Sequence, residues 1–166
     1  MRTPARSIIP IALFSAALTS LMRTADADER QPDQAMKAPV NAVRDFMITL
    51  DRRHLSRAFV TSGAVIFEDF APYVFEGKGA VSRWSAAFVR KSSSEKLSNL
   101  HAEFASGRNF ESSGNRVFFV LPTTWTGSEK HRFVETGTWS FVLVKFKSEW
   151  RIKSYAWAVN TFQYTQ

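Results

Sequence analysis

The stretch that decides the fold is residues 65–84, which run VIFEDFAPYVFEGKGAVSRW. Its first six residues are rich in β-branched and aromatic side chains, a composition typical of a strand. Pro72 ends that strand because proline cannot donate a ladder hydrogen bond. Gly77 and Gly79 then mark a turn, and from Val81 to Phe88 apolar residues recur every three or four positions. The stretch therefore predicts a strand, a turn and an amphipathic helix.

Within the predicted strand, 64–70, side chains alternate between two faces. Val65, Phe67 and Asp69 are thus expected to share one face, and we expect that face to look into the interior. Asp69 is then the acid at any pocket, whereas Glu68 points the other way and is expected to be structural.

Upstream of this stretch the sequence predicts two helices. The first is expected to begin at Pro39, because the missing N–H of proline is not needed at the first helical position. Its buried stripe has the spacing i, i+3, i+7, i+10 and consists of Val40, Val43, Met47 and Leu50, with Phe46 beside it. A short second helix is expected from Leu55 to Val60.

Downstream of Leu97 the hydrophobic pattern has period two, which predicts strands. The breaks between them are short, so neighbouring strands should be antiparallel. The expected strands are 97–110, 115–126, 133–147 and 150–162. The fold class predicted from this order is α+β: a cone-shaped, curved antiparallel sheet wrapped around three helices from the N-terminal half.

The composition restricts the chemistry. The chain has 166 residues, enough for one domain with a core. It has no cysteine, which excludes disulfides, thiolate metal sites and a cysteine nucleophile. Its three histidines lack metal-ligand spacing, so we predict no metal, and without a glycine-rich phosphate loop we predict no cofactor. The net charge is +7, but the sequence contains no run of basic residues and no nucleic-acid motif. We therefore expect a solvated basic surface and no nucleic-acid partner.

The N-terminus has the features of a secretory signal. Two arginines precede an apolar run from Ile8 to Leu21, and small residues precede a possible cleavage site after Ala27. The run is too short to span a bilayer comfortably, although an uncleaved anchor is the alternative. We therefore predict a signal peptide at 1–27, a flexible segment at 28–37 and one domain at 38–166. The mature protein is expected to be secreted or periplasmic, without stable membrane insertion.

The last two predicted strands are apolar on both faces. One face must meet the helices, and the other would be a large exposed apolar patch in a monomer. We expect that patch to be covered by a second copy of the chain. The predicted homodimer contacts are Trp139, Phe141, Tyr155 and Trp157. The alternative is that the sheet curls and buries these rings internally.

Taken in order, these features resemble the nuclear transport factor 2-like superfamily, and within it the SnoaL-like proteins. The resemblance covers about residues 39–162. It rests on the stripe of the first helix, the strand that ends Phe67-Glu68-Asp69, the helix entry at 77–84, and the segments ETGTWSF at 135–141 and WRIKSYAWA at 150–158. It implies the cone-shaped fold, a mostly apolar pocket and a dimer, and it is strongest to small exported bacterial members of unassigned function.

The resemblance also implies site residues. A ketosteroid isomerase carries a proton-moving carboxylate at the end of the first strand, where this chain has Asp69. The isomerase's tyrosine donor on the first helix corresponds to Phe46, and its second donor, an acid, falls near Val142, so two of the three parts are missing. The dehydratases of this fold use His, Tyr and Asp, a set that His101, Tyr73 and Asp69 could imitate.

Three functions remain open from the sequence. The chain is a binding protein for a small apolar or aromatic molecule, a lyase or isomerase that uses Asp69 as general base, or a dimeric interaction module with a vestigial pocket. Whether it is an enzyme stays open. The candidate catalytic residues are Asp69, His101 and Tyr73. The expected pocket residues are Phe46, Leu50, Phe67, Trp84, Phe88, Ser140, Val142 and Ser154.

Overall fold

A computed structural model describes residues 31–165; the predicted signal peptide and the start of the predicted flexible segment lie outside this range. The helical segments lie in the N-terminal half and a run of five strands follows them, as the α+β prediction requires. They are α1 (Gln34–Thr49), the 3-10 helix η1 (Arg52–Arg57), β1 (Val65–Phe67), β2 (Val74–Phe75), α2 (Ala80–Glu95), β3 (Ser98–Phe104), β4 (Arg108–Ser113), β5 (Arg116–Ser128), β6 (Arg132–Phe146) and β7 (Glu149–Thr165).

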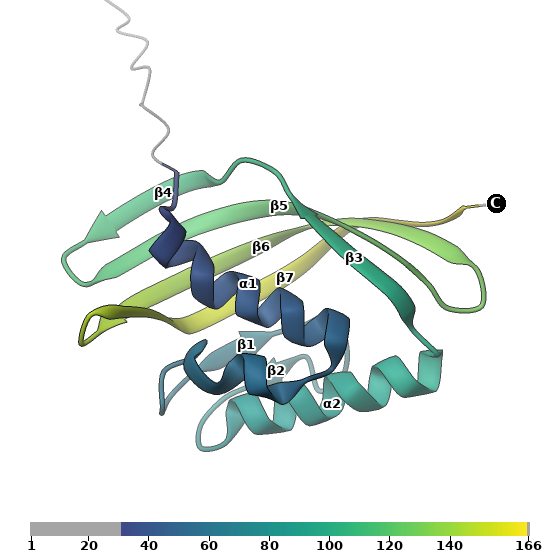
Figure 1. The fold of residues 1–166 in the computed structure, drawn as a ribbon, viewed down its shortest axis with the longest axis horizontal. Coiled ribbons are helices and arrows are strands. Elements are labelled where there is room, and N and C mark those ends of the chain that lie inside the picture. Colours follow the sequence, from purple (N-terminus) through teal and green to yellow (C-terminus); the bar gives the residue numbers. More distant parts are fainter. Residues whose placement is uncertain (1–30, 166) are drawn as a thin grey trace, which may run out of the picture.

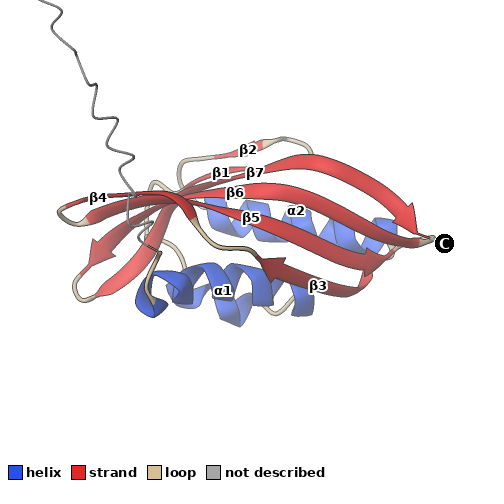
Figure 2. Ribbon diagram, turned by 90° about the horizontal axis from the view of Figure 1, so that it is seen from above, coloured by secondary structure: helices blue, strands red, loops and turns tan. Residues whose placement is uncertain are grey.

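The strands form one curved, open sheet with the order β2-β1-β7-β6-β5-β3, and β4 pairs with β5 beside β3. All strand pairs are antiparallel except β1 with β7, so the sheet is mixed. The three helical segments pack against one face of it, as Figures 1 and 2 show. The predicted fold class is confirmed, and the expected first long strand is divided into β3 and β4.

The helix boundaries differ from the predictions. α1 begins at Gln34 rather than Pro39, because the Asp33 side chain caps it by accepting a hydrogen bond from the Met36 N–H at 2.8 Å. Pro39 therefore lies inside the helix. The short second helix is also shifted toward the N-terminus, since the Asp51 side chain caps η1 in the same way. Side-chain capping, which apolar periodicity does not report, sets both starts.

The inward face of β1 is the reverse of the predicted one. Ile66 is fully buried and Glu68 is 6% exposed, whereas Phe67 is 44% exposed. The cause is the register with β7, which places Ile66 opposite the core residue Tyr155. A strand one residue out of phase exchanges its two faces completely. The prediction that Phe67 faces the interior is therefore wrong.

The core is aromatic, and Trp84 lies at its centre. Its ring centroid is 5.2 Å from that of Phe46, 5.8 Å from that of Phe59 and 5.7 Å from that of Tyr155. These rings join the helices to the inner face of the sheet, and rings at such separations add to the stabilisation that burial gives.

The four residues predicted to contact a second chain belong to this core. Trp139, Phe141, Tyr155 and Trp157 are all buried within the single chain, where they face the helices. The curvature of the sheet explains the error, because it closes this face around the helices instead of exposing it. These four side chains are therefore unavailable as a dimer surface.

Candidate functional site

A cavity of 80 Å³ lies where α2, the end of β1 and the strands β5, β6 and β7 meet. Its walls combine carboxylates with aromatic rings, and Lys91 is the only basic residue that lines it. We call it the acid-aromatic cavity. Its carboxylates are Glu68, Asp69, Glu95, Glu129 and Glu135, and its rings are Phe70, Phe88, Trp125, Phe133, Trp157 and Phe162.

Glu68 is the most deeply buried of these carboxyl groups. Its Oε1 accepts a hydrogen bond from Trp84 Nε1 at 2.7 Å and another from the Tyr155 hydroxyl. Burial raises the pKa of Glu68 to about 8, although these two donors act to lower it. The negative charges of Asp69 and Glu135 raise this pKa further. Glu68 therefore keeps its proton at neutral pH.

The second oxygen of Glu68, Oε2, has no hydrogen-bond partner among the described residues. Within residues 31–165, the fully buried side-chain nitrogen and oxygen atoms without a hydrogen-bond partner are Trp139 Nε1 and Arg151 Nε. Glu68 Oε2 is not among them, so this oxygen is not sealed inside the protein. Because Oε1 accepts two hydrogen bonds, the proton belongs on Oε2. Glu68, which lines the acid-aromatic cavity, is thus a neutral group that can donate one hydrogen bond.

Asp69 stands at the mouth of the cavity, with its side chain partly open to solvent. The atoms packed around it remove enough water to raise its pKa, an effect that the positive charge of Lys91 opposes. Lys91 is itself paired with Glu95, at 2.6 Å between Nζ and Oε2. Asp69 therefore lines the same cavity as a partly neutralised cation and directly follows Glu68 in the chain.

Glu135 contributes a third carboxyl group, from β6. Burial raises its pKa to about 7, and the charge of Asp69 adds to this effect. Trp157 Nε1 donates to Glu135 Oε1 at 3.1 Å and favours the charged form. Three carboxyl groups with different proton affinities thus share one cavity, an arrangement that can bind a polar group or move a proton.

Two of the predicted site residues, Asp69 and Phe88, line the acid-aromatic cavity. Phe46 and Trp84 are buried behind it, where Trp84 orients Glu68 through its indole N–H. Leu50 follows α1 as a half-buried C-cap outside the cavity lining. Other predicted pocket residues lie on the outer face of the sheet, where Val142 pairs with Ser154; these are Phe67, Ser140, Val142 and Ser154.

The predicted trio of His101, Tyr73 and Asp69 is not brought together. The His101 side chain is 65% exposed on β3, with Nε2 at 3.6 Å from Glu103 Oε1. Tyr73 is 59% exposed in the turn before β2. Neither residue lines the cavity at which Asp69 lies.

Sequence analysis missed Glu68, Glu135 and Lys91 as cavity residues. Glu68 was missed because the phase of a three-residue strand is not readable from its own pattern. Glu135 could have been found, since it has the same parity as Phe133 and Trp139 on β6, and both of those side chains are buried. A carboxylate at an inward position of a strand is costly unless a partner or a function explains it.

The part of the chain from 31 to 165 contains no cluster of three or more His, Asp or Glu side chains arranged to hold a metal ion. None of the helices in that range has the length and apolar character required to cross a membrane.

Comparison with solved structures defines the class. The chain has the fold of the nuclear transport factor 2-like superfamily, which confirms at the level of the fold the resemblance predicted from its sequence. A superfamily member from Salmonella enterica serovar Typhimurium LT2 matches with a TM-score of 0.64 at 16% identity, over 77% of this chain and 90% of that chain. No protein-family model matches the sequence, and a search of curated proteins finds no relative.

Two further matches carry names that state an activity. A hexachlorocyclohexane dehydrochlorinase, LinA type 3 from Novosphingobium barchaimii LL02, matches with a TM-score of 0.63 at 9% identity, over 79% of this chain and 88% of that chain. A putative ketosteroid isomerase from Shewanella frigidimarina NCIMB 400 matches with a TM-score of 0.60 at 12% identity, over 76% and 96%. The fold of this chain is therefore one that also occurs in proteins named as enzymes.

Proposed function

We propose that this chain is an exported small-molecule-binding protein whose ligand occupies the acid-aromatic cavity. The single observation that carries the proposal is the place of Glu68, a buried carboxyl group that lines the cavity and whose Oε1 accepts from Trp84 and Tyr155. Burial raises the pKa of Glu68 to about 8, so at neutral pH its second oxygen carries a proton that can be donated to a ligand. A ligand oxygen that accepts from this donor forms a hydrogen bond inside a largely aromatic cavity, where such a bond is stronger than in water.

The walls define the ligand's chemistry. Six aromatic side chains favour an apolar body, and the Glu68 donor favours one accepting oxygen on that body. The volume of 80 Å³ limits the ligand to a small ring or short chain. A small cyclic ketone combines these properties, and a hydrocarbon of the same size lacks only the acceptor.

Cyclopentanone and methylcyclopentane make a matched pair of probes. Binding is followed by the nuclear magnetic resonance shifts of the indole N–H groups of Trp84 and Trp157. We expect the ketone to bind more tightly below pH 8 and to lose this advantage above pH 8, where Glu68 ionises. Glu68→Gln should keep the advantage at high pH, because its amide still donates. Equal binding of the two probes, or no binding of either, refutes the proposal. Glu103→Gln is the control, since Glu103 is exposed on β3.

The second candidate function is proton transfer, as in a lyase or isomerase. The observation that favours it is the adjacency of a carboxylate base, Asp69, and a neutral acid, Glu68, at one cavity. The donors that the isomerase carries at the positions of Phe46 and Val142 are absent here, and Glu68, which directly follows β1, would supply a donor in their place.

Deuterium exchange tests this second function. The α-hydrogens of cyclopentanone are monitored by nuclear magnetic resonance in heavy water, with and without the protein. Catalysed exchange that is lost in Asp69→Asn and reduced in Glu68→Gln supports the enzyme. Exchange at the buffer rate, together with tight ketone binding, leaves the binding protein as the function.

Export and dimerisation complete the proposal. The apolar run from Ile8 to Leu21 supports export, and the mass of protein recovered from a bacterial periplasm tests cleavage after Ala27.

For the dimer we propose the outer face of the sheet, which carries Val120, Val142 and Ala156. Val142→Lys should then convert a dimer to a monomer in light scattering, and a wild-type monomer would contradict this.

A further inference from the structure

A second and larger cavity, of 420 Å³, lies on a different part of the molecule. It is bounded by η1, by the segment 59–64 and by the first turn of α2, and it shares no lining residue with the acid-aromatic cavity. Its charged lining residues are two arginines, Arg52 and Arg151, and no carboxylate lines it. We call it the arginine groove. Its volume is within the range typical of small-molecule sites.

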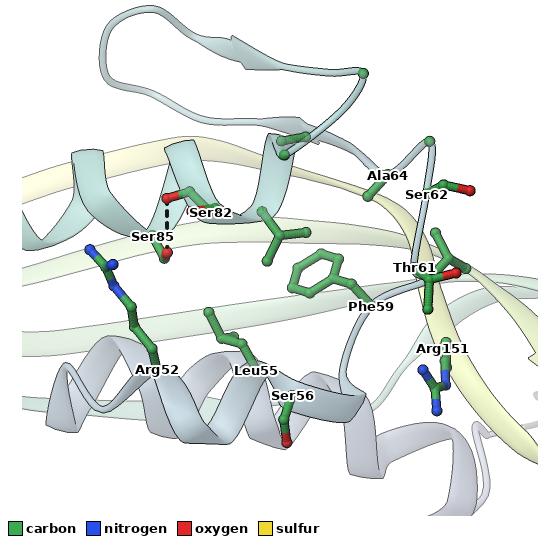
Figure 3. A pocket seen from close by; sticks show the side chains of 16 residues that line it. Arg52, Leu55, Ser56, Phe59, Thr61, Ser62, Ala64, Ser82, Ser85 and Arg151 are labelled. Atoms are coloured by element: carbon green, nitrogen blue, oxygen red, sulfur yellow. Dashed lines mark hydrogen bonds between the residues drawn. The ribbon is translucent and has the colours of Figure 1, made fainter.

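Figure 3 shows how the groove is built. Arg52 extends from η1 toward Ser85 of α2 at one end, and Arg151 lies beyond Thr61 at the other. Leu55 and Phe59 lie between them and supply an apolar floor. The arginines are thus at opposite ends, so the groove suits an elongated ligand better than a single small ion.

The two arginines differ in how far they are already engaged. Arg151 pairs with Glu149 at 3.1 Å, and its guanidinium carbon lies 5.0 Å from the centroid of the Phe146 ring. Arg52 is exposed and makes no ion pair or side-chain hydrogen bond with any residue in the described range. An anionic group at the Arg52 end would therefore meet an uncompensated positive charge.

The start of α2 also contributes to the groove lining. Gly79 is the N-cap of this 16-residue helix and offers no side-chain cap. The Ala80 N–H already donates to the Gly77 carbonyl oxygen at 3.2 Å, so the N–H groups of Val81 and Ser82 are the ones that a ligand could engage. Val81 and Ser82, in that first turn, both line the groove. The positive end of the helix dipole favours an anion there. Arg52 and the start of α2 both line the groove, and each favours an anionic ligand there.

We propose that the arginine groove binds an anionic amphipathic small molecule, with its negatively charged head between Arg52 and the start of α2 and its apolar body over Phe59 and Leu55. The charged residues that line this second site are basic, whereas those of the acid-aromatic cavity are mostly acidic. The second site does not depend on the function proposed for that cavity, since the two have no lining residue in common.

Two probes that differ only in the head group test the proposal: 4-phenylbutyrate and 4-phenylbutan-1-ol. Binding is measured by titration calorimetry, and the site is located from the backbone amide shifts of Val81 and Ser82. We expect the carboxylate to bind at least roughly tenfold more tightly than the alcohol, with an advantage that shrinks at high salt. Equal affinities, or shifts confined to the neighbourhood of Asp69, overturn the proposal.

Arg52→Gln should abolish the preference for the carboxylate, whereas Arg53→Gln should preserve it. Arg53 is the matched control because it is the next residue of η1, is highly exposed and pairs with Asp51 outside the groove. Ser82→Asp is a second variant. The new carboxylate lies in the first turn of α2, where a negative charge stabilises the helix, but it should repel an anionic head group. A preference that survives both Arg52→Gln and Ser82→Asp in folded protein overturns the proposal.

Discussion

Replacing Glu68 by glutamine should flatten the dependence of stability on pH. The buried carboxyl has a pKa of about 8 in the folded protein, against an ordinary value of 4.5. Between these values the folded state holds a proton that the unfolded state has released. The free energy of unfolding therefore falls as pH rises through this window and levels off above about pH 8.

The size of the effect follows from the same two values. At 1.36 kcal/mol per pH unit, the difference between 4.5 and about 8 corresponds to at most ~5 kcal/mol lost between acid and mildly alkaline pH. Glutamine has nearly the same shape, still accepts from Trp84 and Tyr155, and cannot ionise. The Glu68→Gln variant should therefore lack this loss of stability. The part of the fall in stability with rising pH that comes from Asp69 and Glu135 should remain, since the pKa values of both groups are also raised in the folded protein.

Urea unfolding followed by tryptophan fluorescence, from about pH 5 to pH 9, measures both proteins, and the difference between their slopes isolates Glu68. Glu111→Gln, on an exposed position of β4, is the control and should follow the wild type. Parallel curves for the wild type and Glu68→Gln would refute the reasoning, because they would mean that Glu68 is ionised in the folded protein.

Three further predictions concern the same core. Phe46→Ala should lower the free energy of unfolding by about 3–5 kcal/mol, because the Phe46 side chain is buried, and Phe67→Ala by less than about 1 kcal/mol, because the Phe67 side chain is exposed. Urea denaturation measures both variants, and a larger loss for Phe67→Ala would contradict the orientation of β1. Gly137→Ala should cost about 1–3 kcal/mol in urea unfolding or prevent folding, because its methyl group would overlap the Trp157 ring; an unchanged midpoint would be inconsistent with that contact. Tyr155→Phe removes a donor that lowers the pKa of the buried carboxyl, so the alkaline end of the fall in stability should move to higher pH; an unmoved profile would argue against the hydrogen bond.

Much of the fold followed from the sequence. The periodic stripe of Val40 and Val43 determined which face of α1 is buried, and the alternation after Leu97 determined the long strands. Such patterns are reliable because a helix or strand of many residues must place every apolar side chain on one face to form a core. The cone-shaped arrangement followed from the order of these elements.

The candidate site was decided only by the tertiary structure. β1 has three residues, too few for its own alternation to fix which side faces inward, and its pairing with β7 makes that choice. This pairing turns Glu68 toward Trp84 and Tyr155 and sends Phe67 outward. The sheet's curvature likewise turned the expected dimer surface into core. Local periodicity determined the long elements of this protein, whereas contacts between residues distant in sequence decided its short strand, its inward carboxyls and its two oppositely charged cavities.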